Sequence, residues 1–375
     1  MSQPIRVLHC FGRMDRGGAE TYIMNIYRKI NRKKVQFDFV VHTNDICAYD
    51  DEILSLGGNI YRVPRYKGIN LIEYIQAWKN LFNTHNDKWK IIHAHMFTTA
   101  TIYLRIAKKY GLVTIVHSHS TAAGFGLLSK VKSLVQYPVR YIADYLFACS
   151  QSAGEWLYGE KHITNERFRV LNNAIDSKAF SFNLEKRYHK RTEMEIDKKF
   201  VIGHIGRFIE TKNHEFIVNV FYDVVKKEKD SMLLLVGDGK MRSQIEEKVK
   251  KMNLSNNVIF AGIRSDIPDL LQVMDVFLFP SIYEGLPVTL IEAQASGVKC
   301  LISDTISQEV KITEEVKFLS LKKSSEYWAE TILEYCNGYP RKDTHSMICQ
   351  AGYDVGENAK WLEDFYLRKN GVIDG

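Results

Sequence analysis

Apolar and polar residues alternate in blocks along the whole chain. Short apolar runs have the pattern of buried strands, and the stretches between them carry apolar residues at helical spacing. In the first half the expected strands span 5–11, 36–42, 91–95, 113–118, 145–149 and 168–172. The expected helices between them include 19–31, 70–84, 100–110 and 129–143. Strands that alternate with helices in this way predict a doubly wound α/β domain.

The same alternation resumes after a highly charged segment. Residues 183–199 include Glu-Lys-Arg-Tyr-His-Lys-Arg and interrupt the apolar periodicity, so we expect the domain boundary there. The expected strands beyond it span 200–205, 231–236, 257–261, 275–279 and 299–302. A chain of 375 residues is also longer than a single core usually serves. The pattern therefore predicts a second doubly wound domain.

One strand-to-helix junction carries the strongest chemical signal. The strand 275–279 is followed by the segment from Glu284 to Glu292, Glu-Gly-Leu-Pro-Val-Thr-Leu-Ile-Glu, and Pro287 and Gly297 predict a helix from about Leu286 to Ser296. A helix N-terminus beyond the carboxyl end of a parallel strand binds phosphorylated ligands, because its free N–H groups and its dipole favour anions. Glu284 is expected at the mouth of this site. Glu292, among apolar neighbours, is expected to accept hydrogen bonds from a diol such as a ribose, although a solvated Glu292 stays an alternative.

Several motifs together resemble the retaining glycosyltransferases of family 4, which have the two-domain GT-B fold. The segment 275–297 is similar almost residue for residue to the most diagnostic block of that family. Other motifs follow the family's order and spacing: Gly206-Arg207-Phe208 with Lys212-Asn213-His214, 233–239, 258–262, Gly17-Gly18-Ala19-Glu20, His117-Ser118-His119-Ser120 and Asn173-Ala174-Ile175-Asp176.

This resemblance covers nearly the whole chain and implies a division into domains. Residues 1–182 would form a Rossmann-like acceptor-binding domain, and residues 196–355 a Rossmann-like domain that binds a nucleotide-sugar donor across a central cleft. Residues 356–375 would form a terminal helix that crosses back to the first domain. One side of that helix carries Trp361, Leu362, Phe365 and Tyr366.

The resemblance also implies an activity. A hexose or related sugar would move from a nucleotide-diphosphate sugar, expected to be UDP-linked, to an acceptor hydroxyl with retention of anomeric configuration. The expected acceptor is a lipid-linked saccharide in the biosynthesis of a capsule or another exopolysaccharide. Two cations after a strand are by themselves ordinary surface residues, so their role comes from the resemblance. The residues that it assigns to the donor diphosphate, by side chain or by backbone amide, are Arg207, Lys212, Gly285, Leu286, Gly17 and Gly18.

Two further residues are expected near the reacting carbon. The resemblance places His117, at the end of strand 113–118, at the family's active-site histidine. His119 shares its strand face, and His93 and His95 repeat the pattern one strand earlier; the distance from the strand start favours His117.

Glu284 is expected to orient the hydroxyls of the donor sugar or to support an oxocarbenium-like charge. Whether it acts as a nucleophile stays open. Because the chain has no Asp-x-Asp, and Asp50-Asp51-Glu52 has the pattern of a solvated helix N-cap, we expect transfer without a metal or another cofactor. The six cysteines are scattered and predicted to be reduced, packed thiols.

Charge and hydropathy bear on location and partners. A net charge of +7 suits an anionic ligand or an anionic membrane, and by itself also nucleic acid, which the resemblance does not imply. No apolar run reaches the roughly 18 residues of a membrane span, and the N-terminus has no signal-peptide pattern, so we expect a cytoplasmic protein. Residues 124–147 mix apolar residues with lysine and arginine. They indicate either peripheral contact with an anionic inner leaflet or an ordinary surface helix.

Two other classes of protein share parts of this sequence pattern. A dinucleotide-dependent oxidoreductase is disfavoured because the loop from Gly12 to Gly18 lacks the Gly-x-Gly-x-x-Gly spacing. A non-catalytic nucleotide-sugar-binding or scaffolding subunit stays the alternative, since such a protein can retain the same motifs. The presence of every expected site residue favours the enzyme.

Overall fold

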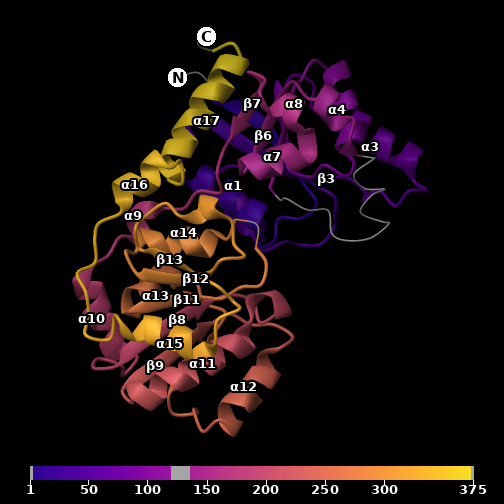
Figure 1. Ribbon diagram of the computed structural model, residues 1–375. Coiled ribbons are helices and arrows are strands. Elements are labelled where there is room, and N and C mark those ends of the chain that lie inside the picture. Colours follow the sequence, from indigo (N-terminus) through magenta and orange to yellow (C-terminus); the bar gives the residue numbers. More distant parts are fainter. Residues whose placement is uncertain (1–2, 120–135, 285, 373–375) are drawn as a thin grey trace. The chain divides into compact units, whose positions relative to one another are not determined.

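The computed structural model describes residues 3–119, 136–284 and 286–372 of the chain. These fall into two compact units (Figure 1). The first comprises Met1–Ala174 together with Asp354–Gly375, and the second is Ile175–Tyr353.

The first unit is built on a seven-stranded parallel sheet of order β3-β2-β1-β4-β5-β6-β7. The central strands are almost wholly buried and mostly apolar, as is usual where both faces of a parallel sheet are covered. The strands are β1 Ile5–Phe11, β2 Val35–Val41, β3 Ile60–Arg62, β4 Ile91–Ala94, β5 Val113–Ser118, β6 Tyr145–Ala148 and β7 Phe168–Val170.

Helices cover both faces of this sheet. One apolar core joins it to α1 and α17, and a second core on the other face joins it to α3, α4 and α7. The described helices of this unit are α1 Gly18–Lys29, α2 Asp50–Ser55, α3 Leu71–Thr84, α4 Ala100–Lys109, α6 Val139–Ile142, α7 Gln151–Tyr158, α8 Glu160–Ile163 and α17 Val355–Lys369.

The second unit repeats the plan with a six-stranded parallel sheet of order β10-β9-β8-β11-β12-β13. Its strands are β8 Phe200–Ile205, β9 Ser231–Val236, β10 Val258–Gly262, β11 Val276–Phe279, β12 Lys299–Ser303 and β13 Val316–Leu319. The prediction of two doubly wound α/β domains is confirmed. The apolar pattern did not predict β3 and β13, which are short strands of three and four residues at sheet edges.

The helices of the second unit also form two layers. One core contains residues of α9, α13, α14 and α16, and the other contains residues of α11, α12 and α15. The helical elements are α9 Ser177–Phe180, α10 Leu184–Glu193, η1 Glu210–Lys212, α11 His214–Lys227, α12 Arg242–Lys251, α13 Ile267–Val273, α14 Val288–Ala295, η2 Gln308–Val310, α15 Ser325–Leu333 and α16 His345–Gln350.

The charged segment that was expected to separate the domains forms α10 and belongs to the second unit. Arg187 and Arg191 of this helix both bind the carboxylate of Asp275, at 2.5 and 2.6 Å. The same carboxylate accepts the backbone N–H of Val201 at 2.8 Å. The chain passes between the units at Ala174, before this helix, because the arginines fasten α10 to the second sheet.

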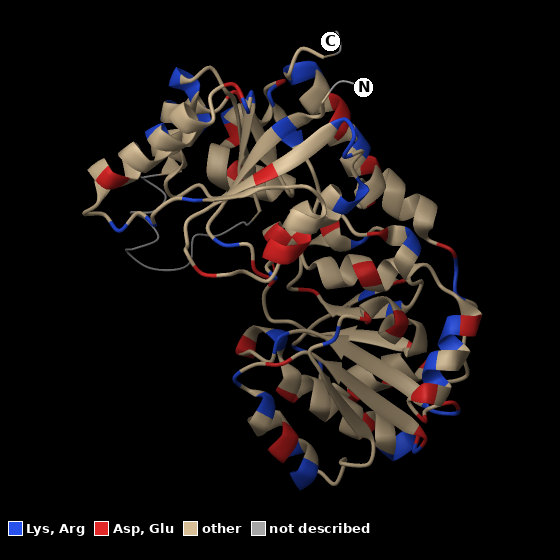
Figure 2. Ribbon diagram, turned by 180° about the vertical axis from the view of Figure 1, so that it is seen from behind, with Lys and Arg blue, Asp and Glu red and all other residues tan. Residues whose placement is uncertain are grey.

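Lys, Arg, Asp and Glu residues lie mainly on helices and loops, and the strands carry few of them (Figure 2). Asp38 in β2 is a buried exception, paired with Arg6 at 2.6 Å. Asp50, expected in a solvated cluster, is also buried and binds Arg62 at 2.8 Å. The expectation for Asp50 was wrong because β3, which carries Arg62, was not foreseen.

The last helix completes the first unit. Leu362 and Tyr366 of α17 are fully buried in the core that contains β1, β2 and α1. The Tyr366 hydroxyl is 2.7 Å from Nδ1 of His93 in the middle of the sheet. Helix α17 is therefore a structural part of the same unit as β1 and α1.

Truncating this helix contact should loosen the first unit alone. We expect Leu362→Ala to cost about 2 to 5 kcal/mol, because it leaves a cavity in a close-packed core. Hydrogen exchange read by mass spectrometry should show faster exchange in β1 and β4, with β8 and β11 unchanged. Lys360→Ala, an exposed change on the same helix, is the control and should alter neither set. Equal loss of protection in both units would contradict the assignment of α17 to the first.

Candidate functional site

In the second unit the loops after β8 and β11 meet at the carboxyl edge of the sheet, where these two strands are neighbours. Lys212 ends η1 after β8, and Glu284 follows β11. Nζ of Lys212 is 2.6 Å from Oε1 of Glu284, and the two side chains are only 15% and 14% exposed. The same ammonium lies 4.7 Å from the centre of the Phe279 ring. The structure thus brings together two predicted site residues that are far apart in sequence.

Backbone contacts hold these two loops in register. Asn213 adopts the left-handed conformation, with φ 58°, which asparagine tolerates better than most residues. Its side-chain amide donates to the Pro280 carbonyl at 3.1 Å. The Ile282 N–H donates to the Thr211 carbonyl at 2.8 Å. The two residues on either side of Lys212, Thr211 and Asn213, are therefore both hydrogen-bonded to the loop after β11.

The loop after β9 packs closely against the loop after β8. Gly237 has φ 129°, and a Cβ there would lie 2.2 Å from the carbonyl oxygen of Gly206. Only glycine permits this approach. Arg207, which follows Gly206 in the sequence, is exposed, and no ion pair joins it to another described residue. Its guanidinium is free to reach a ligand.

Glu292 lies in α14, which begins at Val288. The carboxyl is partly buried and makes no hydrogen bond within the described parts of the chain. Burial raises its pKa to about 7. An unpartnered carboxyl at this depth fits the predicted diol contact. Leu286 precedes the first turn, and Gly285 lies outside the described residues.

Small hydroxyl residues that were not predicted from the sequence hold the segment before Glu284 in place. The Ser303 and Thr305 hydroxyls donate to the Ser281 carbonyl at 2.5 and 2.9 Å. Ser303 ends β12, so the only signal was a polar residue at the end of an apolar strand.

Two buried histidines beneath Lys212 were also missed. His204 and His214 have ring centroids 4.8 Å apart. Burial lowers the pKa of both, to about 4 for His214, and the nearby Lys212 charge adds to the effect. Both are therefore neutral at pH 7 and add no positive charge to that of Lys212.

In the first unit Gly17 and Gly18 open α1 directly after β1, as predicted. A Cβ on Gly17 would lie 2.3 Å from the Glu20 carboxylate, whereas one on Gly18 would meet open space. Burial raises the pKa of Glu20. A carboxyl group therefore lies beside the amides that the resemblance assigned to the diphosphate.

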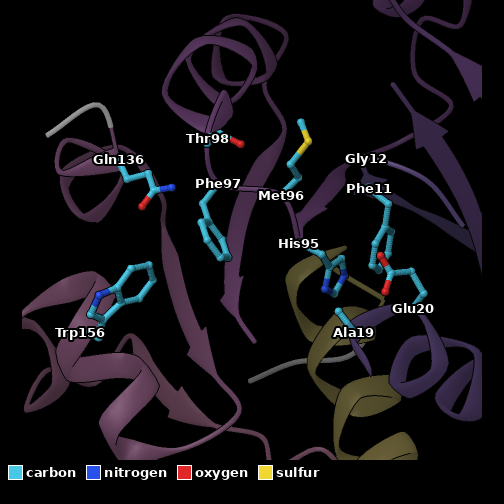
Figure 3. Close-up of a pocket in the computed structure, with 10 residues that line it drawn as sticks. All are labelled: Phe11, Gly12, Ala19, Glu20, His95, Met96, Phe97, Thr98, Gln136 and Trp156. Carbon is cyan, nitrogen blue, oxygen red and sulfur yellow. The ribbon is translucent and has the colours of Figure 1, made fainter. Parts of the chain in front are cut away.

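Glu20 also lines a cavity of about 400 Å³ in this unit (Figure 3). His95 and Glu20 lie on one side of it, and Phe97 and Trp156 lie on the other. Phe11, Gly12, Ala19, Met96, Thr98 and Gln136 complete its lining. A cavity with aromatic, carboxyl and imidazole groups suits a polar ligand with an apolar face, such as a sugar.

His117 lies in β5 and is completely buried. Its ring stacks on His119 with centroids 4.1 Å apart. Burial, with the neighbouring histidines His119 and His93, lowers its pKa well below the usual value; the backbone of Leu171 opposes this only partly. Among His93, His95, His117 and His119, the two imidazoles nearest to solvent are those of His119, which is partly exposed, and His95.

The first half of the basic segment 124–147, residues 124–135, lies outside the described residues. Its described end contains Arg140, which donates to the Leu157 carbonyl at 2.7 Å. Among the helices that the structure describes, none is long and apolar enough to span a bilayer.

Comparison with known proteins gives the class of this protein. Residues 186–352 match the family model described as Glycosyl transferases group 1, and residues 16–179 match Glycosyltransferase Family 4. EpsF of Bacillus subtilis (strain 168), which is named as a glycosyltransferase, is 38% identical over 369 residues, 96% of each chain. The chain therefore belongs to the group 1, family 4 glycosyltransferases, and the predicted resemblance is confirmed.

More distant relatives and a solved structure extend this picture. The capsular polysaccharide biosynthesis glycosyltransferase CapH of Staphylococcus aureus is 24% identical over 97% of this chain and 99% of its own. An Escherichia coli UDP-Gal:alpha-D-GlcNAc-diphosphoundecaprenol alpha-1,3-galactosyltransferase is 25% identical over 64% of each chain. Anabaena Alr3699/HepE, solved in complex with UDP, aligns with a TM-score of 0.72 at 16% identity, over 99% of this chain and 97% of that one. The two parallel sheets are thus those of the GT-B fold.

Proposed function

We propose that this glycosyltransferase moves a hexose or related sugar from a UDP-sugar to a hydroxyl of a lipid-linked saccharide during polysaccharide biosynthesis. The transfer retains anomeric configuration and needs no metal. The observation that carries the proposal is the Lys212–Glu284 pair, held between the β8 and β11 loops beside α14. The relatives support the donor and acceptor classes through their names: UDP-galactose and a diphospholipid for the E. coli enzyme, and capsular polysaccharide for CapH.

The donor diphosphate would lie against Lys212 and Arg207. As the bond from the anomeric carbon to the diphosphate oxygen breaks, negative charge grows on the leaving group, and a fixed cation in a poorly solvated site stabilises that charge. Arg207 adds a second, mobile cation, and the amide of Leu286 together with those of Gly285, Gly17 and Gly18 would complete the anion site. Positive charge from side chains fills the role that a metal has in other transferases.

The sugar and the nucleoside would be held by carboxylates on either side of the diphosphate. Glu284, once Lys212 turns to the phosphates, is free to accept hydrogen bonds from hexose hydroxyls or to face the developing positive charge at the anomeric carbon. Glu292 would accept hydrogen bonds from the ribose diol. His117, from the first unit, would contact the donor sugar near the reacting carbon.

The acceptor would bind the first unit, and the protein would work in the cytoplasm at the inner face of the membrane, where lipid-linked saccharides are reached. The cavity lined by Glu20, His95, Phe97 and Trp156 has the aromatic and polar groups that sugars require. A non-catalytic donor-binding subunit is the second candidate, and it is favoured by the complete burial of the His117 imidazole, the residue expected near the reacting carbon.

A donor screen tests the proposal. Thermal unfolding is measured with UDP-, GDP- and ADP-sugars, and at about 100 times its dissociation constant a true donor adds roughly 2.7 kcal/mol, a shift of a few degrees. We expect a shift with UDP-sugars alone. Transfer to a lipid-linked acceptor, or slow hydrolysis of the donor, should then proceed undiminished in excess chelator.

Each contrary result has a definite meaning. No shift with any nucleotide sugar would reject the donor site. Binding without transfer or hydrolysis would establish the non-catalytic alternative, and activity that a chelator abolishes and a divalent cation restores would reject metal independence.

A further inference from the structure

Five histidines gather at the carboxyl end of the sheet in the first unit. His93 and His95 are two residues apart at the end of β4, and His117 and His119 have the same spacing at the end of β5, so each pair shares a strand face. β4 and β5 are neighbours in the sheet, and His9 of β1 lies opposite His93 in register. The topology alone brings the five rings to one place.

Three of these histidines form a chain of hydrogen bonds that ends at an asparagine. Nδ1 of His9 is 3.1 Å from Nε2 of His95, and Nδ1 of His95 is 2.8 Å from Nε2 of His119. Nδ1 of His119 is 3.4 Å from Oδ1 of Asn173. Because an amide oxygen only accepts, His119 carries its proton on Nδ1, which leaves Nε2 as a lone pair that faces Nδ1 of His95.

Other ring nitrogens in the group have no such partner. Both nitrogens of His117, Nε2 of His9 and Nε2 of His93 are buried and make no hydrogen bond of good geometry with a described residue. Buried polar atoms nearly always have a partner, so several in one cluster call for an explanation.

We propose that His95, His117 and His119 form a binding site for a transition-metal ion of the Zn²⁺ type. One nitrogen from each can be chosen so that all three lie within 4.8 Å of one another. Neutral imidazoles are preferred ligands of Zn²⁺, and three of them leave a fourth position for water. Tetrahedral ligands about 2.0 to 2.1 Å from zinc are about 3.3 Å apart, so the His95 and His119 rings need to separate by only a few tenths of an ångström.

The surrounding hydrogen bonds suit a metal placed between Nδ1 of His95 and Nε2 of His119. His119 then still donates from Nδ1 to Asn173. His95, with its proton moved to Nε2, donates to Nδ1 of His9, whose own proton moves to its Nε2. Each of these two ligands keeps a partner on its far nitrogen, the arrangement usual around protein-bound zinc.

The site can be reached from solvent. His95 lines the cavity of about 400 Å³ shown in Figure 3, and His119 is partly exposed. One nitrogen each from His9, His93 and His95 also lie within 4.8 Å of one another. His9 and His93 are completely buried, however, so this deeper set is harder for an ion to reach. On the proposed function, on which this consequence alone rests, a bound ion would occupy His117 and slow sugar transfer.

Metal titration of the full-length protein, without any nucleotide sugar, tests this site. We expect equilibrium dialysis to give one Zn²⁺ per chain, and Co²⁺ to give the visible absorption of a tetrahedral nitrogen site. His119→Gln should weaken binding by about 100-fold or more, and Asn173→Ala, which removes only the supporting hydrogen bond, by about 10- to 100-fold. Circular dichroism and metal-free thermal unfolding show that each variant is folded.

Two matched controls give the test its direction. His189→Gln removes an exposed histidine of the second unit and should leave binding unchanged. His345→Gln disrupts another close pair of possible ligands, in which Nδ1 of His345 is 3.7 Å from Sγ of Cys349. This change should also leave Zn²⁺ binding unchanged. The proposal is overturned if Zn²⁺ does not bind, if both His119→Gln and His95→Gln bind it normally, or if His345→Gln alone abolishes binding. Because no sugar nucleotide is present, none of these results bears on the donor proposal.

Discussion

Lys212→Ala is expected to lower kcat for sugar transfer by about 100- to 1,000-fold, the range for removing one preorganised charge stabiliser from an active site. Lys212 is held under tight constraint: its ammonium is 2.6 Å from Glu284 and 4.7 Å from the centre of the Phe279 ring. When the donor binds, this ammonium turns to the diphosphate and is already in place to stabilise the negative charge that grows as the bond breaks. The loss should therefore appear in kcat more than in the KM for the donor, because the charge that Lys212 meets grows during the reaction.

The control for this change is Lys240→Ala, which removes an exposed lysine that pairs with Glu210 at 3.0 Å. It should alter kcat less than twofold or so, since surface ion pairs contribute little. Lys212→Arg should restore only part of the rate, because a planar guanidinium does not fit the position of a point charge. Steady-state kinetics over a range of donor concentrations checks all three variants. Equal losses in Lys212→Ala and Lys240→Ala would show that general surface charge, not this pair, supports transfer.

Glu292→Gln is expected to stabilise the free protein at pH 8 while it weakens donor binding. Burial raises the pKa of this carboxyl to about 7 in the folded protein, from about 4.5 in the unfolded chain. The folded state thus holds the proton more tightly, so the contribution of Glu292 to stability is fully present below pH 4.5 and is lost as the pH rises to about 7. Glutamine removes this decline. The gain in the free energy of unfolding should be near zero at pH 4.5 and reach roughly 1 to 3 kcal/mol at pH 8.

Donor binding should change in the opposite direction. An ionised Glu292 accepts strong hydrogen bonds from a ribose diol, so affinity for the donor in the natural protein should rise as the pH increases through about 7. The Gln variant should bind the donor about 10- to 100-fold more weakly at pH 8 and lose most of that pH dependence. Chemical unfolding and isothermal titration at pH 4.5, 6 and 8 measure both effects. Glu314→Gln, at a carboxylate that is 78% exposed, is the control, and the same pattern there would refute a specific role for Glu292.

The fold could be predicted from the sequence because most of the buried parallel strands are dominated by apolar residues. The run 275–279 and the Pro287 and Gly297 signals placed β11 and α14 to within a few residues. Short edge strands such as β3 leave too little pattern. Because β3 was not predicted, the ion pair between its Arg62 and Asp50 was not predicted either, and Asp50 was expected to be solvated.

The sequence offered candidate site residues one by one, but not the contacts between them. Lys212 and Glu284 meet because β8 and β11 are adjacent, and strand order is a property of the whole sheet. The histidine chain depends in the same way on the order of β1, β4 and β5. A repeated His-x-His was visible in the sequence, whereas the bond from His119 to Asn173 was not.

The division of the first unit between both ends of the chain has a consequence for synthesis on the ribosome. The second unit, Ile175–Tyr353, is continuous and leaves the ribosome whole, whereas the first unit begins earlier but lacks α17 until Val355–Lys369 is translated. The half that is made first is thus the half that finishes folding last. Until then the apolar surface of β1, β2 and α1 that Leu362 and Tyr366 later cover stays open. A nascent chain stalled near residue 353 should therefore present this surface to chaperones, and release of the finished chain should end that contact.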